Sequence, residues 1–311
     1  MTTALVTHPD CLAHLTPQGH PECVARLEAV LEALSAPRFK GLHRVEAPVV
    51  DTADLLRAHT PELLALLREA LPADRWAALD ADTFLSPGSL DAAFRAAGAA
   101  CLATDMVLAG DVANAFCAVR PPGHHAERDR AMGFCLFNSI AIAALRALDH
   151  HGLARVAVVD FDVHHGNGTQ DILWDEARAL YVSTHQMPLY PGTGDRHETG
   201  AHGNIINVPL PPGTGGAAFR QAMEAMVLPA LEDFAPDLLL ISAGFDAHAD
   251  DPLAQMALTE ADFAWVTGRL CDIADRHCGG RVVSALEGGY NLAALAAGTA
   301  AHVEILMERG A

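Results

Sequence analysis

Four residues that can bind metals or move protons follow a hydrophobic run near the middle of the chain. In the stretch VAVVDFDVHHGNGTQ, residues 156–170, the apolar run Val156–Val159 predicts a buried strand, and Gly-Asn-Gly cannot continue it. Between them lie Asp160, Asp162, His164 and His165. In an extended segment residues i and i+2 project to the same side, so Asp162 and His164 can converge on one ion.

A third ligand is available from another strand end, where Asp246 lies in the stretch GFDAHADD. Two carboxylates and one imidazole suit Zn²⁺ or Fe²⁺ and leave positions open for water and substrate. The alternative for an isolated Asp-x-His is a helix cap or a surface pair. The position of both stretches at strand ends favours a metal site.

Adjacent histidines and a tyrosine could supply the proton chemistry. His124 and His125, in RPPGHHA, can stand beside a metal, one taking a proton and the other holding or returning one, with Asp160 and Asn167 as candidate partners. Tyr290 follows Gly-Gly and could donate a hydrogen bond to an oxyanion. The alternatives are two solvent-exposed loop histidines, in a chain with 17 of them, and a tyrosine that only packs.

Short apolar runs alternate with helical patterns, which predicts a parallel sheet covered by helices on both faces. The expected strands are Ala4–Thr7, Ala113–Val119, Val156–Asp160, Leu180–Thr184, Ile205–Val208, Leu238–Ser242 and Val282–Ala285. The expected helices are Pro21–Ser35, Pro61–Leu71, Ser89–Ala109, Asn138–His150, Ala217–Phe234, Glu260–Arg276 and Leu292–Met307, with Thr60 and Thr259 placed to cap two of them. The clusters RPPGHHA, DFDVHHGNG, SAGFDAHADDPL and LEGGYNL each follow a strand, so we expect one site at the carboxyl edge of the sheet.

Composition limits the class of protein. The 311 residues are 51% hydrophobic and show no linker or repeat, so we expect a single domain over 1–311. A net charge of −19 disfavours nucleic acid as a partner. Apolar runs are interrupted before the roughly 20 residues of a membrane helix, and no signal peptide is recognisable, so we expect a cytoplasmic protein without a membrane partner. Seven scattered cysteines predict reduced thiols, and one lysine against nineteen arginines suggests a GC-rich bacterium.

The motifs RPPGHHA, GFCLFNSIAIA, VDFDVHHGNGTQ, LYPGTGD, SAGFDAHADDPL and EGGYNL together resemble the histone deacetylase family, in its class II branch and the bacterial histone deacetylase-like amidohydrolases. The resemblance runs from His20 to Leu292. It implies the arginase–deacetylase α/β fold, with a single parallel sheet of about eight strands between helical layers. Where many relatives have HPERP, this chain has HPECV, so Cys23 and Val24 alter the first loop.

The resemblance also implies a role for each catalytic residue. Asp162, His164 and Asp246 would bind the catalytic zinc. Asp160 would orient His124, and Asn167 would orient His125, the general base that acts on the attacking water. Tyr290 would polarise the amide carbonyl and stabilise the tetrahedral intermediate. A structural K⁺ would bind Asp160, Ser183, Thr184 and the backbone carbonyls of Asp162 and His164.

Substrate-binding residues are implied in the same way. Gly133, Phe134 and Tyr190 match the walls of a narrow acyl-lysine tunnel, Asp82 matches a rim aspartate, and Arg26 matches an arginine near the acetate exit. Leu253 stands where polyamine-selective relatives carry a glutamate, which favours the aliphatic stem of acyl-lysine.

The expected function is a metal-dependent amidohydrolase that removes acetyl groups from lysine side chains of proteins or peptides. One alternative is an acetylpolyamine amidohydrolase, and another, of a different class, is a non-catalytic acyl-group binder or sensor. The sequence leaves the oligomeric state open.

Overall fold

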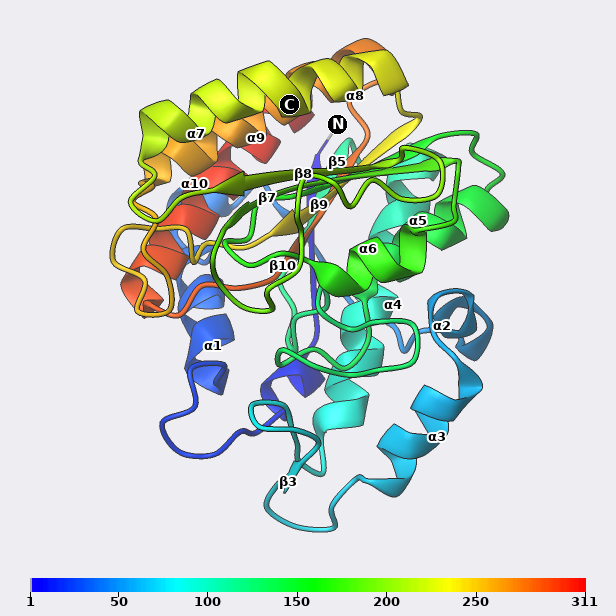
Figure 1. Cartoon of the computed structure of the whole chain (residues 1–311). Coiled ribbons are helices and arrows are strands. Elements are labelled where there is room, and N and C mark those ends of the chain that lie inside the picture. Colours follow the sequence, from blue (N-terminus) through cyan, green and yellow to red (C-terminus); the bar gives the residue numbers. More distant parts are fainter. Residues whose placement is uncertain (1) are drawn as a thin grey trace.

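A parallel sheet of eight strands forms the centre of the computed structural model, which describes residues 2–311 (Figure 1). The strand order is β2-β1-β5-β10-β9-β6-β7-β8, and every neighbouring pair is parallel. The strands are β1 (Thr3–Thr7), β2 (His43–Glu46), β5 (Asn114–Cys117), β6 (Val156–Asp160), β7 (Ala179–Gln186), β8 (Ile205–Leu210), β9 (Leu238–Ala243) and β10 (Val282–Leu286). A separate two-stranded hairpin pairs β3 (Ala77–Ala78) with β4 (Phe84–Leu85).

Helices cover both faces of the sheet (Figure 1). One layer contains α1 (Val24–Ala33), α7 (Gly216–Ala222), α8 (Leu228–Phe234), α9 (Glu260–His277) and α10 (Leu292–Gly310). The other contains α2 (Thr52–Ala58), α4 (Ser89–Ala109), α5 (Ser139–Asp149) and α6 (Asn167–Leu173), while α3 (Pro61–Glu69) lies beyond α2. Short 3₁₀ turns occupy Pro9–Leu12 and Pro37–Phe39.

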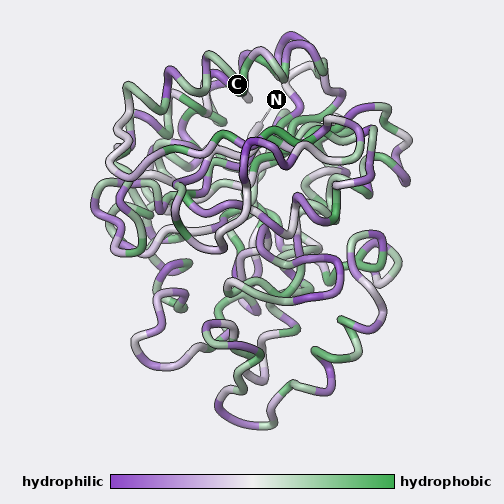
Figure 2. The backbone as a smooth tube through the Cα atoms, in the orientation of Figure 1, coloured by the Kyte–Doolittle hydropathy of each residue, from purple (hydrophilic) through white to green (hydrophobic). Residues whose placement is uncertain are grey.

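The central strands are buried on both faces, as the two helical layers require. All residues of β5, β6, β9 and β10 are buried, and Figure 2 shows hydrophobic residues, in green, along parts of the sheet. Helix α4 alone among the described helices is long and apolar enough to span a membrane, contrary to our expectation of interrupted apolar runs. It packs on β1, β5 and β10 with 61% of its most apolar window buried, so its hydrophobicity is that of a core helix.

All seven predicted strands belong to the sheet, and β6 and α4 have the predicted bounds. The sequence did not indicate β2, whose residues HRVE lie at the sheet edge and are largely exposed. It also did not indicate α2 and α6, each of seven residues and too short for a clear hydrophobic period. The predicted caps are present: Thr60 accepts a hydrogen bond from the Leu63 N–H, and the Asp262 carboxylate accepts one from the Thr259 N–H.

The helix predicted over Ala217–Phe234 is interrupted. A π-helical segment, Met223–Val227, separates α7 from α8, and Pro229 lies in the first turn of α8. Proline has no N–H to donate to the carbonyl four residues earlier, so a continuous α-helical ladder cannot run through this point.

The close approach of α4 to the loop before α2 requires glycine at position 98. A β-carbon there would lie 2.0 Å from the Pro48 carbonyl oxygen, which is a backbone atom that cannot rotate away. The Val50 N–H also donates to the Phe94 carbonyl of α4 and holds the loop at this distance. Gly268 in α9 has room for a β-carbon, because the nearest atom would be 4.0 Å away.

We therefore expect Gly98→Ala to destabilise the protein by about 1–3 kcal/mol, the usual cost of overpacking, in spite of the higher helix propensity of alanine. Gly268→Ala is the matched control and should be neutral or stabilising by up to about 1 kcal/mol. Thermal unfolding of the two variants measures the difference. An unchanged melting temperature for Gly98→Ala would show that α4 and the loop can separate without cost.

Candidate metal and catalytic site

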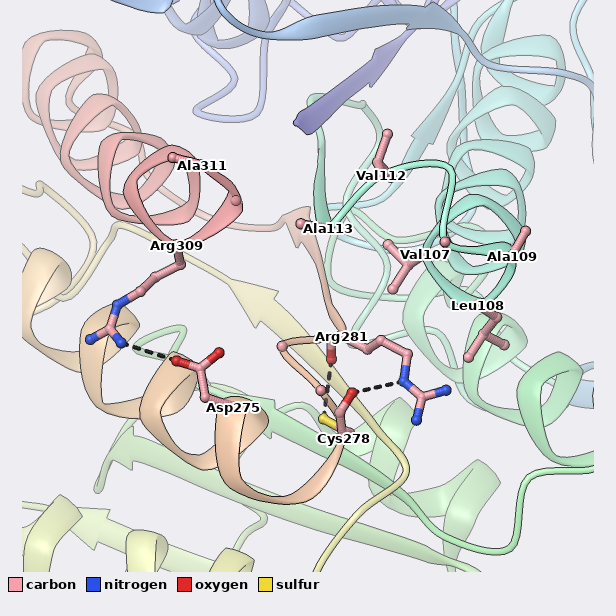
Figure 3. A pocket seen from close by; sticks show the side chains of 14 residues that line it. Val107, Leu108, Ala109, Val112, Ala113, Asp275, Cys278, Arg281, Arg309 and Ala311 are labelled. Atoms are coloured by element: carbon pink, nitrogen blue, oxygen red, sulfur yellow. Dashed lines mark hydrogen bonds and ion pairs between the residues drawn. The ribbon is translucent and has the colours of Figure 1, made fainter. Parts of the chain in front are cut away.

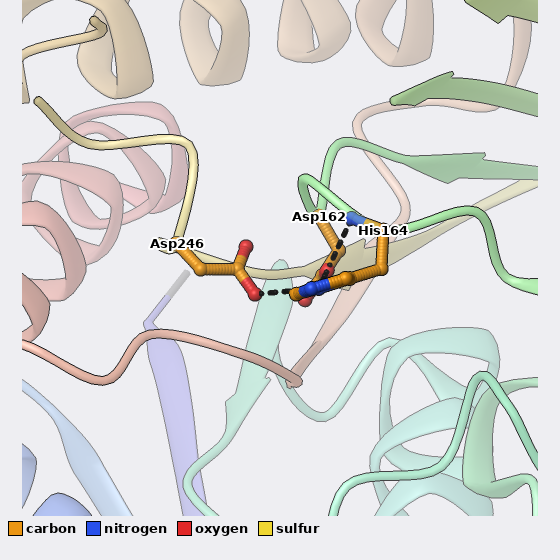
Figure 4. Close-up of side chains that lie close together, drawn as sticks. All are labelled: Asp162, His164 and Asp246. Atoms are coloured by element: carbon orange, nitrogen blue, oxygen red, sulfur yellow. Dashed lines mark hydrogen bonds and ion pairs between the residues drawn. The ribbon is translucent and has the colours of Figure 1, made fainter. Parts of the chain in front are cut away.

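Asp162, His164 and Asp246 come together beyond the carboxyl ends of β6 and β9, as predicted (Figure 4). One ligand atom from each lies within 4.8 Å of the others, and all three residues are buried. His164 Nδ1 is 3.1 Å from Asp162 Oδ1 and 3.1 Å from Asp246 Oδ2. The three side chains therefore point at a common position that a cation could occupy.

The segment that carries Asp162 and His164 is bent, which differs from the extended geometry we expected. Strand β6 ends at Asp160. Asp160 Oδ1 accepts the Asp162 N–H at 3.1 Å, and Asp162 Oδ1 accepts the His164 N–H at 2.9 Å. Each aspartate thus binds its own backbone two residues on, the pattern of an Asx-turn. The two side chains converge because consecutive turns position them, and the pleat of a strand is not involved.

The backbone also fixes the other carboxylate oxygens. Gly288 N–H donates to Asp162 Oδ2 at 2.8 Å, and Val163 N–H donates to Asp246 Oδ1 at 2.9 Å. A β-carbon on Gly288 would lie 2.0 Å from Asp246 Oδ2, so only glycine fits between the two carboxylates. Among residues 2–311, Asp246 Oδ2 and His164 Nδ1 have no hydrogen-bond partner outside the three-residue cluster, so these atoms can face the common position.

The cluster is electrostatically demanding without a cation. Burial and the neighbouring Asp162 carboxylate raise the pKa of Asp246 to about 7. Burial opposes protonation of His164, but its hydrogen bonds to Asp162 and Asp246 outweigh it and raise the pKa of His164 to about 10. Protons are therefore drawn into the site. A divalent cation would neutralise the same two carboxylates, which fits this set of donors.

His124 forms an ion pair with the aspartate at the end of β6. His124 Nδ1 is 3.0 Å from Asp160 Oδ2, and the Tyr181 hydroxyl donates to the same oxygen at 3.0 Å. Burial opposes protonation of His124, but the carboxylates of Asp162 and Asp160 raise its pKa to about 10. His124 is suited to remain a cation and to donate from both ring nitrogens.

His125 has the opposite character. Its Nδ1 lies 2.8 Å from Asn167 Oδ1, as predicted. Burial, together with the positive charge of neighbouring His124, holds the pKa of His125 well below its usual range. The pKa values of the two adjacent histidines are thus shifted in opposite directions, because carboxylates act on His124 whereas burial and neighbouring positive charge act on His125.

Glu287 is a buried residue of the site that the sequence analysis missed. Its Oε2 accepts the N–H groups of Gly123 at 2.7 Å and His124 at 3.1 Å, and its Oε1 accepts the Ser242 hydroxyl at 3.1 Å. Glu287 therefore fixes the backbone of the histidine pair to the ends of β9 and β10. An acidic residue directly after the buried strand VVSAL, in the motif EGGY, was the available signal.

A cavity of about 210 Å³ leads to the site. The predicted residues Asp82, Gly133, Phe134, Tyr190 and Leu253 line it, and so do His125, His164 and Tyr290. Leu189 also lines it and was not predicted. Phe134 has a positive φ of 68°, an uncommon conformation for a bulky residue, and its N–H donates to the Thr83 hydroxyl at 3.2 Å.

Arg26 does not line this cavity and lies behind Tyr290. Its guanidinium carbon is 4.8 Å from the centre of the Tyr290 ring, and its Nε donates to the Gly289 carbonyl at 2.6 Å. Glu22, also fully buried, pairs with Arg26 at 3.1 Å and with Arg120. Arg26 is therefore placed to fix the tyrosine loop, and its predicted place at an acetate exit stays a prediction.

The residues predicted to hold K⁺ surround the end of β6 from the neighbouring strand. Ser183 of β7 pairs in register with Asp160. The Thr184 hydroxyl is buried and has no hydrogen-bond partner among the described residues. An unpaired buried oxygen next in the chain to Ser183 fits a cation ligand.

A larger cavity of about 510 Å³ lies at the amino ends of β5 and β10, away from this chemistry (Figure 3). Its two arginines are engaged locally: Arg309 pairs with Asp275, and Arg281 donates to the Cys278 carbonyl. It contains none of the predicted site residues.

We expect Asp162→Asn to fold but to lose stoichiometric metal, because the amide keeps the shape of the side chain and loses the charge that a divalent cation requires. Asp54→Asn is the control: Asp54 is also a buried carboxylate, but it pairs with Arg57 and Arg146 in the α2–α5 region. Plasma emission after zinc loading and dialysis measures the metal content. Full zinc occupancy in Asp162→Asn would contradict the assignment of the ligands.

Known proteins of one family share both the sequence and the fold. The family model for the histone deacetylase domain matches residues 20–306. A histone deacetylase-like amidohydrolase of Pseudomonas aeruginosa is 44% identical over 88% of this chain and 73% of its own length. A probable deacetylase of Archaeoglobus fulgidus is 38% identical over 94% of this chain and 82% of its own length.

The crystal structure of the HDA15 HD domain superposes with a TM-score of 0.94 and 36% identity, covering 99% of this chain and 89% of that one. This match confirms the arginase–deacetylase fold that the motifs implied. The chain belongs to the histone deacetylase family, whose members are hydrolases of the amidohydrolase type.

Proposed function

We propose that this protein is a zinc-dependent amidohydrolase that removes acetyl groups from lysine side chains. The observation that supports this most directly is that three groups line one cavity: the metal-ligand cluster through His164, the His125 imidazole, and Tyr290. A non-catalytic acyl-group binder has no need of a base and an acid beside a metal site, so this convergence favours the enzyme.

Asp162, His164 and Asp246 would hold the metal ion, and their two carboxylates and one imidazole suit Zn²⁺, with Fe²⁺ as the alternative. When bound, the ion would supply Lewis-acid polarisation of the amide carbonyl and would acidify a water molecule. We also propose that a structural K⁺ binds near Asp160 with Ser183 and the unpaired Thr184 hydroxyl.

His125 would take the proton from the attacking water. Its Nδ1 faces the Asn167 oxygen and so must carry the hydrogen of that bond, which leaves Nε2 with a free lone pair. Because its pKa lies well below its usual range, His125 is in the basic form at neutral pH. A protonated histidine, His125 after this transfer or the cationic His124, would then protonate the departing amine.

Tyr290 would donate a hydrogen bond to the oxyanion of the tetrahedral intermediate. Burial raises the pKa of Tyr290 well above its usual range, so the phenol keeps its proton. The Tyr290 N–H donates to Asp251 Oδ2 at 2.7 Å, while Asp251 Oδ1 accepts the Leu253 N–H at 2.9 Å. One carboxylate therefore fixes both the oxyanion donor and one wall of the cavity before substrate binds.

The walls of the cavity favour an aliphatic chain. Phe134, Leu189, Tyr190 and Leu253 present mainly apolar surface, and Asp82 is the one acidic side chain among the residues that line the cavity. This suits the methylene stem of acyl-lysine. The observation that favours an acetylpolyamine instead is the net charge of −19, which attracts cations. That attraction is screened within about 8 Å at physiological salt, whereas Leu253 acts at contact distance.

We expect Tyr290→Phe to lower kcat by about 100- to 1000-fold, the typical loss for one oxyanion donor, with little effect on hydroxamate affinity. Tyr190→Phe removes the same hydroxyl from a half-exposed wall residue and should leave kcat within a few-fold of the wild type. Steady-state acetate release and inhibitor titration measure the two quantities. Equal losses in both variants would assign Tyr290 to packing alone.

The function is tested with a substrate panel. We expect a higher kcat/KM for acetyl-lysine peptides than for N-acetylspermidine or N-acetylputrescine, and we expect Leu253→Glu to shift the ratio toward the polyamines because a carboxylate can pair with their distal ammonium. Leu253→Gln, polar but uncharged, is the control and should not shift it. If the wild-type enzyme prefers an acetylpolyamine tenfold over every lysine peptide, the polyamine alternative replaces the present proposal. If it releases no acetate from any substrate even with zinc, the enzymatic proposal fails.

A further inference from the structure

Behind His125 a chain of hydrogen bonds leads outward from the cavity to Glu127. His125 Nδ1 lies 2.8 Å from Asn167 Oδ1, and Asn167 Nδ2 donates to Glu127 Oε1 at 2.7 Å. No role for Glu127 follows from the motifs or from the metal cluster. It is half-buried, two residues beyond His125, and its carboxylate faces away from the cavity toward Asn167.

An asparagine side chain does not by itself determine which nitrogen of a facing histidine carries the hydrogen. If Asn167 presents its oxygen, His125 Nδ1 must be N–H and Nε2 is free to accept a proton. If Asn167 presents its NH₂ group, Nδ1 must accept, Nε2 carries the hydrogen, and the histidine cannot act as a base toward the cavity. The orientation of the amide therefore selects between an active and an inactive tautomer of His125. The contact between Asn167 and His125 does not by itself determine that orientation.

Glu127 resolves this choice, because a carboxylate accepts hydrogen bonds and donates none. It requires Asn167 to present the NH₂ group outward and hence the oxygen to His125. Two other groups near Asn167 Nδ2 also accept, namely the Met132 thioether at 3.3 Å and the His125 carbonyl at 3.4 Å, but both contacts are longer and neither is charged.

The backbone of Glu127 is fixed on both sides. Its N–H donates to the Arg130 carbonyl at 2.9 Å, and its carbonyl accepts a hydrogen bond from His59 Nδ1 at 3.0 Å. His59 Nε2 in turn accepts the Asn138 N–H at 2.9 Å, so the His59 ring must carry its hydrogen on Nδ1. These hydrogen bonds fix the backbone of Glu127 at the position from which its carboxylate reaches Asn167.

We propose that Glu127 is a positioning residue that sets the tautomer of His125 through the orientation of the Asn167 amide. This rests on the proposed role of His125 as the base. For an active enzyme, one of the side chains at positions 127 and 167 must therefore donate their shared hydrogen bond and the other must accept it. The side chain at 167 must also present an acceptor to His125.

Four variants test this requirement for a matched donor and acceptor. Glu127→Gln keeps an acceptor oxygen and should stay within a few-fold of wild-type kcat. Glu127→Leu removes the acceptor at similar volume and should lower kcat by about 10- to 100-fold, part of the usual contribution of a general base, with KM within about threefold. Asn167→Asp places two acceptor-only carboxylates opposite each other and should also lose activity. The double variant Glu127→Gln/Asn167→Asp restores a donor, since the glutamine NH₂ can meet the new carboxylate, and should exceed Asn167→Asp in kcat.

Recovery in the double variant is a result that a merely structural role would not give, because independent losses add. Wild-type kcat in Glu127→Leu, or a double variant no better than Asn167→Asp, would overturn the proposal. If Glu127→Leu fails to fold, the comparison of Asn167→Asp with the double variant remains decisive.

A second measurement does not depend on turnover. In zinc-loaded protein with ¹⁵N-labelled histidine, the resonances of His125 are identified by their loss in His125→Ala. We expect protonated Nδ1 and unprotonated Nε2 in the wild type and in Glu127→Gln, and a mixture of tautomers in Glu127→Leu. An unchanged tautomer in Glu127→Leu would refute the role of Glu127. Absence of deacetylase activity together with the expected tautomers would refute only the proposed function.

Discussion

The structure depends on the burial of four carboxylates at one edge of a sheet. Asp160, Asp162, Asp246 and Glu287 are all at most 1% exposed, and they lie at or just beyond the ends of strands β6, β9 and β10, which are themselves fully buried. An unpaired buried charge costs several kcal/mol, so this edge folds only if the surroundings supply compensation. Backbone N–H groups supply part of it, the His124 cation supplies another part, and a divalent cation at the cluster would supply the rest.

That requirement explains the unusual loops of the edge. Each loop turns its N–H groups toward a carboxylate: Asp160 and Asp162 accept from their own segment, and Gly288 donates to Asp162. The glycines are required because the carboxylates approach the backbone closely. A β-carbon on Gly244 would lie 2.0 Å from Asp162 Oδ2, as one on Gly288 would from Asp246 Oδ2. The ligands are consequently held in position by the fold.

The sequence predicted the site better than it predicted the elements around it. Dense polar residues after apolar strands place Asp162, His164 and Asp246 at one edge, because parallel strands end together. Glu287 and Glu127 were not predicted, because each acts through the N–H groups from which it accepts hydrogen bonds. Glu287 accepts from residues 123 and 124 and Glu127 accepts from residue 167, and these partners are distant in the chain. Strand β2 and helices α2 and α6 are short, so their formation depends on tertiary contacts more than on a local pattern.

Two adjacent histidines of this site have pKa values that are shifted in opposite directions, although they occupy similar positions. His124 and His125 share a backbone, their ring centres are 4.0 Å apart, and both are buried. The carboxylates of Asp162 and Asp160 outweigh burial and raise the pKa of His124, whereas burial and the charges of His124 and His164 lower the pKa of His125. The direct partner of His124 is the Asp160 carboxylate, and that of His125 is the neutral Asn167 amide. A carboxylate behind both rings would raise the pKa of both histidines and bring two positive charges side by side. A neutral partner avoids this, but it brings the ambiguity of the amide, which an acceptor such as Glu127 behind the asparagine can remove.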